Sequence, residues 1–565
     1  MNLGDIDRWD IGALDALEET LTTRIAVLAD VENELAAIES LPGWTGDASA
    51  AARNASGLTR ADVNHDAVGI GAVRALTQQT RVAVAHLQSQ LGGLRETATA
   101  NSMLITEAGG VLDTAFAVPP TDPSARAVRE KIRADLHDSA HALIMQAVDI
   151  DADAAQVLAR AGDGTLVGDG AVDLASSLTT GAGQGELSAP FPPRDATASQ
   201  VDAYWDALPE EQRAQMISEH PQLIGNLDGI PASARSEANI SQIAGDRERL
   251  EQEATALRAK LDDNTFGGFF SDDDAALGHV QNKLADLESI ERSLKDNPGA
   301  LLTVYDMTSH ERGLAAIAVG NPDSADHVTV TTPGLGTNIG DSLESMVREA
   351  KNINGEMMDQ LELAGRSDET VANVAWIGYQ PPELGGVSWW DSISGAGDVA
   401  SDEIAKDGGA SLASYFHGLD AASTNPDPNI SAFGHSYGSL TTSEALQHGG
   451  SEVVDNAVFY GSPGLNAVGT SDMGMDYEDV WVMDAEGDYV TSLGRLGPFS
   501  PFEAGPYNNN YQEISTAPGT TPDGIARDGV DDHSGYPRLG SNGELRTSGY
   551  NLAVIGIGRP DLVMK

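Results

Sequence analysis

Residues 430–447 read ISAFGHSYGSLTTSEALQ, and they join a short apolar run to a helix-like segment that begins at Tyr437. The junction carries the pattern Gly-x-Ser-x-Gly, with Gly434 and Gly438 on either side of Ser436. A strand that turns sharply into a helix needs small residues at these two positions, because the serine backbone is strained and neighbouring elements crowd it. The segment therefore predicts a buried strand, an exposed nucleophilic serine, and a helix N-terminus that stabilises negative charge beside it.

Similar short apolar runs occur on both sides of this segment from about residue 300 onward, and helix-length stretches separate most of the later ones. Strands that alternate with helices are typical of a mostly parallel sheet with helices on both faces. We expect the first two runs, which only the polar stretch DMTSHERG separates, to form an antiparallel hairpin at one edge. The predicted strands are 301–305, 314–319, 328–332, 371–377, 430–433, 453–460 and 479–483.

A serine hydroxyl is a weak nucleophile unless a base, itself oriented by an acid, takes its proton. In sheets with this kind of serine turn the chain order is serine, then acid, then histidine. His533 is the only histidine after His448, so it is the predicted base. Two acids follow the strand that ends near Met483. Asp488 lies four residues further into the loop than Asp484 and is the favoured partner, with Asp484 as the alternative.

Two backbone N–H groups must also point at the negative charge that develops on the substrate oxygen. The Tyr437 N–H directly follows the nucleophile, and the glycine-rich loop at 332–337 follows the third predicted strand. Leu335 is the predicted second donor, with Gly336 next to it as the alternative. The loop does not complete a dinucleotide-binding pattern, because its next glycine, Gly340, comes one residue too late. We therefore expect no nucleotide cofactor.

Four residues are candidates for the substrate pocket. Gly336 belongs to the glycine-rich loop, and His435 is expected to shape the pocket because the backbone directs it away from the serine. Trp389 and Trp390 lie in a Pro/Gly-rich stretch after the 371–377 strand, where they either roof an apolar pocket or pack a lid onto the sheet. The chain has no cysteine, which excludes a thiol nucleophile, disulfides and cysteine-ligated metal clusters, and no metal site is predicted.

Within residues 1–115 the pattern differs, because apolar residues recur every three or four positions. This spacing predicts two long amphipathic helices around a break at Leu41–Gly46, and such a hairpin must bury its stripes against each other or a partner. We expect further helices and a linker within 116–198, a helical strap or cap over 199–298, and a catalytic domain over 299–565. The linker is the Gly/Pro/Ser-rich stretch Gly181–Pro193, and the stripes are Leu14, Leu17, Leu21, Ile25, Leu28, Val31, Leu35 and Ile38, then Val73, Leu76, Val84, Leu87, Leu91 and Leu94.

Asp and Glu outnumber Lys and Arg by 86 to 33, which gives a formal net charge of −53. A field of this sign repels phosphate backbones and anionic lipids, so nucleic-acid binding and polybasic membrane attachment fit poorly. No apolar run reaches the roughly 18 residues of a membrane-spanning helix. The first residues lack the basic and apolar regions of a Sec-type signal peptide. We expect a soluble protein that is either cytoplasmic or exported by another route.

Several distinctive segments follow one another along the last two thirds of the chain: Tyr204–Trp205, Leu208–Gln212, His220–Pro221, Ile224–Pro231, Pro333–Gly334, the serine turn, Gly487–Asp488 and His533–Tyr536. Together they make residues 200–558 resemble an actinobacterial α/β-hydrolase family. The resemblance implies an α/β-hydrolase fold behind a helical N-terminal region. It also implies that the acid position falls on Asp488, although the usual Asp-Pro of the family is Asp488–Tyr489 here.

The first 110 residues resemble the small substrates of type VII (ESX-type) secretion, because a long helical hairpin carries Trp44-Thr45-Gly46 at its bend. That resemblance implies a helical protein partner or the secretion machinery as the partner of residues 1–115. The export signal of those substrates, Y-x-x-x-[DE] after the second helix, is missing, since the first tyrosine in the chain is Tyr204. Export by this route is therefore left open.

These observations predict a serine hydrolase that cleaves small-molecule or lipid carboxylic esters through an acyl-enzyme intermediate. Ser436 attacks, His533 carries the proton, and Asp488 orients the imidazole. The same arrangement also serves amide and thioester cleavage, which stay open as substrates. A different class of function is an interaction protein, in which the hairpin binds a secretion partner and the sheet is only a scaffold. The intact order of serine, acid and histidine argues against that alternative.

Overall fold

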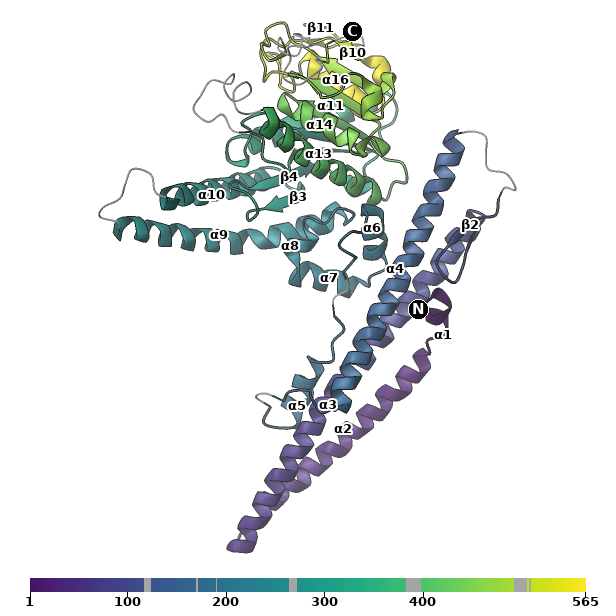
Figure 1. Ribbon diagram of the computed structural model, residues 1–565, viewed down its shortest axis with the longest axis vertical. Coiled ribbons are helices and arrows are strands. Elements are labelled where there is room, and N and C mark those ends of the chain that lie inside the picture. Colours follow the sequence, from purple (N-terminus) through teal and green to yellow (C-terminus); the bar gives the residue numbers. More distant parts are fainter. Residues whose placement is uncertain are drawn as a thin grey trace. The chain divides into compact units, whose positions relative to one another are not determined.

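The computed structural model describes residues 1–115, 123–168, 171–188, 191–263, 272–382, 398–491, 506–507 and 510–565. The chain forms two compact units of different architecture, whose elements Figure 1 labels and colours along the sequence. The helical unit comprises Met1–Ala196 and Ala203–Ala214, and the sheet unit comprises Thr197–Asp202 and Gln215–Lys565.

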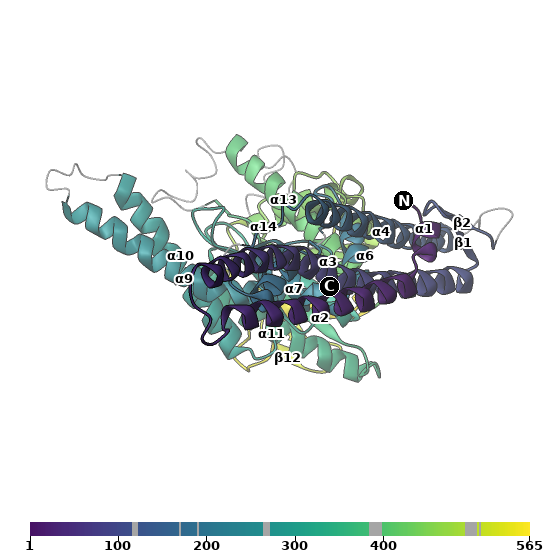
Figure 2. The ribbon, with the colours of Figure 1, turned by 90° about the horizontal axis from the view of Figure 1, so that it is seen from below.

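Two long helices dominate the helical unit, as the apolar spacing predicts, and they run side by side in both ribbon views (Figures 1 and 2). The bend between them contains Gly43 and Gly46 at φ +77° and +100°, a conformation that only glycine adopts without strain. Two further helices pack against the second of the pair. The helices are α1 (Leu3–Arg8), α2 (Ile11–Glu39), α3 (Asp47–Ala100), α4 (Pro123–Gly162) and α5 (Leu174–Ala182).

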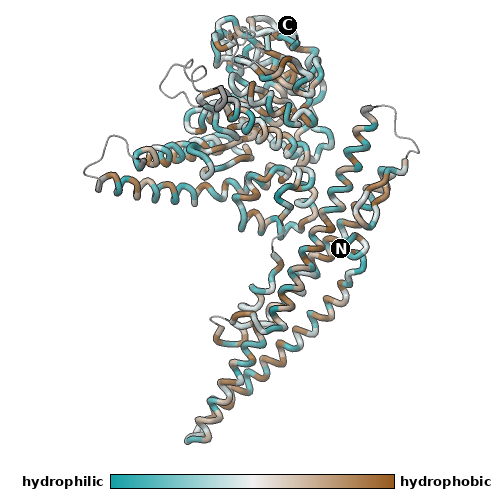
Figure 3. The backbone as a smooth tube through the Cα atoms, viewed as in Figure 1, coloured by the Kyte–Doolittle hydropathy of each residue, from teal (hydrophilic) through white to brown (hydrophobic). Residues whose placement is uncertain are grey.

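The two predicted stripes are buried to different extents within the helical unit. Apolar and polar residues alternate along both long helices (Figure 3). On α3 the stripe is mostly buried, with Leu76, Leu87 and Leu91 at 4% exposure or less, because α4 and α5 cover it. On α2 only Leu21 is fully buried, and Leu17 is 39% exposed. The helical unit thus leaves much of the α2 stripe accessible to solvent.

A short β-hairpin replaces the helix that the sequence predicts for the end of residues 1–115, so that prediction is wrong over its last residues. The strands β1 (Met103–Ile105) and β2 (Val111–Asp113) pair antiparallel. Ser102, at φ +55°, turns the chain out of α3, and Gly109, at φ +85°, closes the turn between the strands. The chain leaves the helix at Ser102, and the three-residue strands that follow are too short to leave a sequence pattern.

The start of the predicted linker Gly181–Pro193 belongs to a packed helix contact, and α5 extends into it. An added Cβ at Gly181 would come within 2.0 Å of the Val68 carbonyl oxygen, and one at Gly185 within 1.9 Å of the Ala72 carbonyl oxygen. Only residues without a side chain allow this approach of two backbones. Here the glycines that suggest a flexible linker instead serve close packing against α3.

Part of the predicted strap at 199–298 also belongs to the helical unit. Tyr204 is buried there, its hydroxyl donates to Asp149 Oδ2 at 2.9 Å, and its carbonyl accepts from the Gln146 side chain at 2.9 Å. The short helices in this region are α6 (Ala198–Asp206), α7 (Glu210–Glu219) and α8 (Pro221–Ile224), and the long α9 (Ala232–Asp263) and α10 (Asp272–Asp296) follow.

Within the described residues, an eight-stranded sheet in the order β10-β9-β8-β7-β5-β6-β4-β3 forms the core of the sheet unit. Neighbouring strands are parallel except that β4 runs antiparallel to both of its neighbours. The predicted α/β class, its mostly parallel sheet and the antiparallel edge pair are confirmed. The strands are β3 (Leu301–Asp306), β4 (Leu314–Val319), β5 (His327–Thr332), β6 (Val371–Ile377), β7 (Asn429–His435), β8 (Asn456–Tyr460), β9 (Val480–Met483) and β10 (Gln512–Ile514).

Successive residues of a strand point to opposite faces of the sheet, and both faces carry apolar side chains that helices cover. α13 (Asp398–Ala421) and α14 (Tyr437–Gln447) pack on the face that carries Ala316 and Val330. On the opposite face, α11 (Ile339–Leu363) packs beside α16 (Thr547–Gly556). The helices α9 and α10 also cover this second face, near the β3–β4 edge. Among the described helices, none combines the length and the apolarity needed to cross a membrane.

Candidate active site

The serine turn has the geometry that its glycines predict. Ser436 follows β7 and caps α14 at φ +55° and ψ −127°, a conformation that costs a non-glycine residue roughly 1–3 kcal/mol. An added Cβ at Gly434 would lie 2.7 Å from the Ser439 Cα atom, and one at Gly438 would lie 2.3 Å from the Thr332 carbonyl oxygen. Both glycines are therefore required by the crowding around the turn.

Three loops at the carboxyl ends of the strands bring a serine, a histidine and an acid together. His533 Nε2 lies 2.8 Å from Ser436 Oγ. On the other side of the ring, His533 Nδ1 lies 2.9 and 3.0 Å from the two carboxylate oxygens of Asp488. Of the two candidate acids, the structure places Asp488 against the histidine, whereas Asp484 stands four residues earlier, at the start of the same loop.

The Asp488 carboxylate is held in its ionised form by its donors. The side chain is buried, and burial by itself raises the pKa of a carboxyl group. Hydrogen bonds from His533, Tyr536 and the Val490 N–H outweigh burial and lower the pKa of Asp488 below its ordinary value. An ionised carboxylate at Nδ1 keeps the ring proton on that nitrogen and leaves Nε2 free to accept the serine proton.

His435 contacts the loop of the histidine instead of the serine. Its Nε2 lies 2.8 Å from the His533 carbonyl oxygen, and the two rings lie 4.8 Å apart. Burial lowers the pKa of His435 to about 3, with the nearby His533 as a second cause. The imidazole is therefore neutral, and because a carbonyl only accepts, its Nε2 carries the proton. The predicted pocket residue thus lies behind His533 and supports its backbone.

This burial predicts a contribution of His435 to acid sensitivity. The unfolded chain binds a proton at this ring near pH 6.5, whereas the folded chain does so only near pH 3, so stability falls as the pH falls between these values. His435→Gln keeps a donor for the His533 carbonyl and removes the titration. Between pH 7 and pH 5 the variant should lose about 1–2 kcal/mol less stability than the parent, measured by urea unfolding.

The matched control for this pH experiment is His310→Gln, because His310 lies exposed in the turn between β3 and β4. Its stability profile should run parallel to that of the parent protein. If the His435→Gln profile also runs parallel to the parent profile, the neutral state of His435 is wrong.

The loop between β5 and α11 lies directly over the nucleophile. An added Cβ at Gly334 would come within 2.5 Å of the Ser436 Cβ atom. Gly336, at φ +74°, uses its N–H to donate to the Pro382 carbonyl at 3.0 Å, so of the two predicted donors in this loop only Leu335 remains. The Tyr437 N–H lies at the first residue of α14, directly after the nucleophile. Trp389 and Trp390 fall outside the described residues.

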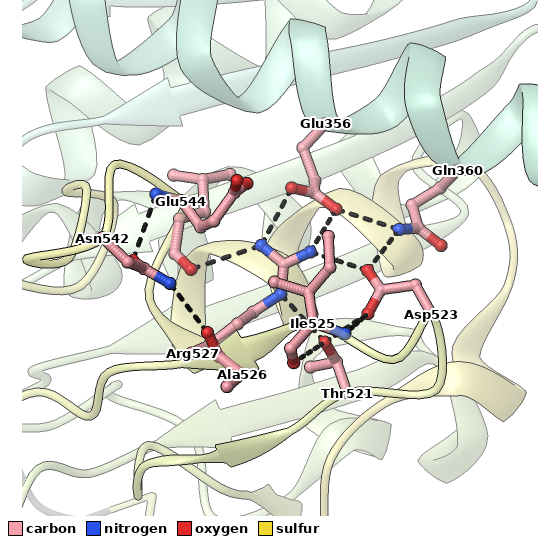
Figure 4. Close-up of polar contacts among 10 residues, drawn as sticks. Glu356, Gln360, Thr521, Asp523, Ile525, Ala526, Arg527, Asn542 and Glu544 are labelled. Carbon is pink, nitrogen blue, oxygen red and sulfur yellow. Dashed lines mark hydrogen bonds and ion pairs between the residues drawn. The ribbon is translucent and has the colours of Figure 1, made fainter.

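A buried ionic cluster surrounds Arg527 (Figure 4), six residues before His533 in the chain. The Arg527 guanidinium, which is fully buried, donates to both Glu356 oxygens at 2.9 and 2.7 Å and to Asp523 Oδ2 at 2.7 Å. The side-chain amide of Gln360, which lies on α11, donates to both the Glu356 and the Asp523 carboxylates. Arg527 lies in β12 (Ala526–Arg527), which pairs with β11 (Gly519–Thr520), so the cluster joins this small hairpin to α11.

Two residues of the site were missed by sequence reasoning. The Tyr536 hydroxyl lies 2.8 Å from Asp488 Oδ2, and its signal in the sequence is its place at the end of the His533–Tyr536 segment, which belongs to the family resemblance. Gly461, at φ +60°, follows β8, and an added Cβ there would lie 3.1 Å from Asp488 Oδ2 and from His533 Nδ1. Within the described part of the chain, no three histidine or carboxylate side chains converge in a way that could hold a metal ion.

Comparison with known families matches residues 309–498 to the family described as Alpha/beta hydrolase. Uncharacterized protein Rv2079 of Mycobacterium tuberculosis (strain ATCC 25618 / H37Rv) is 32% identical over 375 residues, which cover 62% of this chain and 55% of that protein. Uncharacterized protein Rv0963c of the same strain is 35% identical over 251 residues, which cover 44% of this chain and 89% of that protein. The chain thus spans about half the length of the first relative. No solved structure matches the chain.

Proposed function

The chain belongs to the alpha/beta hydrolase family, and on that premise we propose that it is a serine hydrolase that cleaves carboxylic esters. The observation that carries the proposal is the continuous line from Ser436 Oγ to His533 Nε2, and from His533 Nδ1 to Asp488, at 2.8 and 2.9 Å. A scaffold protein has no need of this alignment, since a buried carboxylate and a strained serine cost folding energy.

In the proposed reaction His533 Nε2 takes the proton of Ser436 as its oxygen attacks the ester carbonyl carbon. The carbonyl oxygen becomes negatively charged, and the N–H groups of Tyr437 and Leu335 stabilise it. His533 then gives the proton to the departing alcohol, which leaves an acyl group on Ser436. A water molecule, deprotonated by the same histidine, attacks the acyl group, and His533 returns this proton to the Ser436 oxygen as the carboxylic acid leaves. Asp488 stays ionised throughout and stabilises the imidazolium.

Small-molecule or lipid esters are the proposed substrates, because an alcohol leaves more readily than an amine. The formal net charge of −53 supports neutral or cationic esters over anionic ones, since a field of this sign repels anions. Amides and thioesters use the same triad, and they form separate arms of the test.

The test is active-site labelling with a fluorophosphonate, followed by a panel of p-nitrophenyl esters, matched p-nitroanilides and acyl thioesters. We expect one label per chain, on the peptide that contains Ser436, and the highest kcat/KM on an ester. Prior labelling should abolish ester turnover in proportion to the labelled fraction. Label on another residue, or turnover that survives complete labelling of Ser436, would contradict the proposal.

A further inference from the structure

A buried tyrosine lies on the far side of the acid from the histidine. Tyr536 is fully buried, and its hydroxyl lies 2.8 Å from Asp488 Oδ2 and 3.0 Å from the Ala485 backbone nitrogen. Its ring lies 5.4 Å from the ring of Tyr460, the last residue of β8. The hydroxyl therefore contacts the turn that carries Asp488 at two points.

The direction of each hydrogen bond follows from the donor inventory. The Ala485 N–H can only donate, so it donates to the tyrosine oxygen. The single proton of Tyr536 is then directed to Asp488, whose ionised carboxylate can only accept. Burial, together with the negative charge of Asp488, raises the pKa of Tyr536 and keeps this proton in place.

The hydroxyl joins the two ends of the acid turn. The Asp488 N–H donates to the Ala485 carbonyl at 2.9 Å, which closes a tight turn over residues 485–488. Tyr536 bonds the N–H of the first residue of this turn and the carboxylate of the last. A side-chain rotation of Asp488 away from His533 would break the bond to Tyr536 as well as the bond to the histidine.

The same loop supplies both neighbours of the carboxylate. His533 and Tyr536 are three residues apart, and both bond Asp488 Oδ2, at 2.9 and 2.8 Å. The Ser548 hydroxyl, at the start of α16, donates to the Tyr536 carbonyl at 2.6 Å and ties this loop to the helix. The acid turn and the histidine loop are thus closed into one ring of contacts.

We propose that Tyr536 is a positioning residue of the hydrolase, which holds Asp488 in line with His533 and draws part of its negative charge. The proposal rests on the proposed function for its effect on turnover, but its structural claim concerns only Asp488 and His533. Because Tyr536 shares the charge of the carboxylate, its loss strengthens the remaining hydrogen bond to the histidine. Its loss also leaves the Ala485 N–H buried without a partner, which loosens the turn.

The test is Tyr536→Phe, which keeps the buried ring and removes only the hydroxyl. We expect kcat on the best ester, counted per fluorophosphonate-reactive site, to fall about 10- to 100-fold, the loss typical of a hydrogen bond to a charged group. KM should change less than about threefold, because Tyr536 touches no substrate. The midpoint of the acid limb of kcat/KM should move upward by about half a pH unit.

The matched control is Tyr550→Phe. Tyr550 is also fully buried in the C-terminal part of the sheet unit, and its hydroxyl has no hydrogen-bond partner among the described residues. This variant should keep the kcat and the pH profile of the parent. A merely structural role of Tyr536 would lower the fraction of reactive sites and leave the turnover and pH profile of each site unchanged. That result would overturn the proposal.

A second measurement needs no substrate: the low-field proton resonance of the His533 Nδ1–H, assigned by its absence in His533→Gln. Tyr536→Phe should shift this resonance, and Tyr550→Phe should not. An unshifted resonance together with normal turnover refutes the role of Tyr536, even if Ser436 is labelled and esters are cleaved. A shifted resonance in a protein that cleaves no ester instead refutes the proposed function and leaves the positioning of Asp488 intact.

Discussion

Replacing Ser436 by alanine should lower kcat for ester hydrolysis by roughly 10⁴- to 10⁶-fold, the loss that removal of a triad nucleophile causes. The reason is that His533 would have no hydroxyl to deprotonate, and no acyl-enzyme could form. The fold should survive, because alanine is smaller than serine and the contacts of the turn are made by the backbone and by its two glycines. Steady-state kinetics and a urea unfolding curve measure both quantities on the same preparation.

Ser431→Ala is the matched control for this substitution. Ser431 is a fully buried serine on the same strand, β7, and its hydroxyl contacts Asn456 instead of the triad. Its loss should leave kcat within about twofold of the parent, because the Ser431 hydroxyl contacts neither Ser436, His533 nor Asp488. If the Ser436→Ala variant keeps more than a trace of the parental rate of ester hydrolysis, a nucleophile other than Ser436 carries the activity.

Replacing Arg527 by methionine should destabilise the sheet unit by about 3–5 kcal/mol, the cost of removing one partner from a buried ion pair. Burial alone lowers the pKa of Arg527, but the Glu356 and Asp523 carboxylates more than compensate and raise it. Without the guanidinium, these two carboxylates would stay buried at 8% and 1% side-chain exposure, with Gln360 as a shared donor. The shift of the urea midpoint at an unchanged slope measures the loss.

The control for the ion cluster is Arg559→Met, which removes a similar pair on the surface. Arg559 and Asp561 are 32% and 62% exposed, so solvent screens their attraction and the loss should stay within about 0.5 kcal/mol. Adding Glu356→Gln and Asp523→Asn to Arg527→Met should recover about half of the lost stability, because no uncompensated charge is then buried. A loss in Arg527→Met as small as that in Arg559→Met would show that the cluster is not buried in solution.

Features that depend on neighbouring residues were predictable from this sequence. All seven predicted strands occur, because each is a short run rich in β-branched, aromatic and other apolar residues. The serine turn was equally readable, because Gly-x-Ser-x-Gly is a local pattern, although only the crowding at Gly434 comes from the adjacent residues and that at Gly438 comes from Thr332 and Pro333 at the end of β5. The two long N-terminal helices follow from a periodicity of three and four residues.

Features that depend on contacts between segments distant in the chain were misread or missed. The glycines at 181 and 185 suggest a linker, yet they are small because a backbone carbonyl of α3 lies within 2.0 Å of where each side chain would begin. The short strands β1, β2, β10, β11 and β12 have two or three residues each, which is too few for a periodic pattern. Their pairing is set by the partner strand and not by their own residues.

For the candidate site, chain order was enough to select Ser436 and His533, and it narrowed the acid to Asp484 or Asp488. The place of Asp488 in its loop and the family resemblance already favoured it over Asp484, and the folded loop shows why: the turn that ends at Asp488 and the hydroxyl of Tyr536 direct that carboxylate to the imidazole. Contacts that hold the site join residues far apart in the chain: Tyr536 and Asp488 are 48 positions apart, His435 and His533 are 98 apart, and Arg527 and Glu356 are 171 apart. Residue type and local spacing specify which chemical groups are present, whereas distances between loops arise only when strands pair and helices pack, so tertiary contacts alone bring those groups within hydrogen-bonding reach.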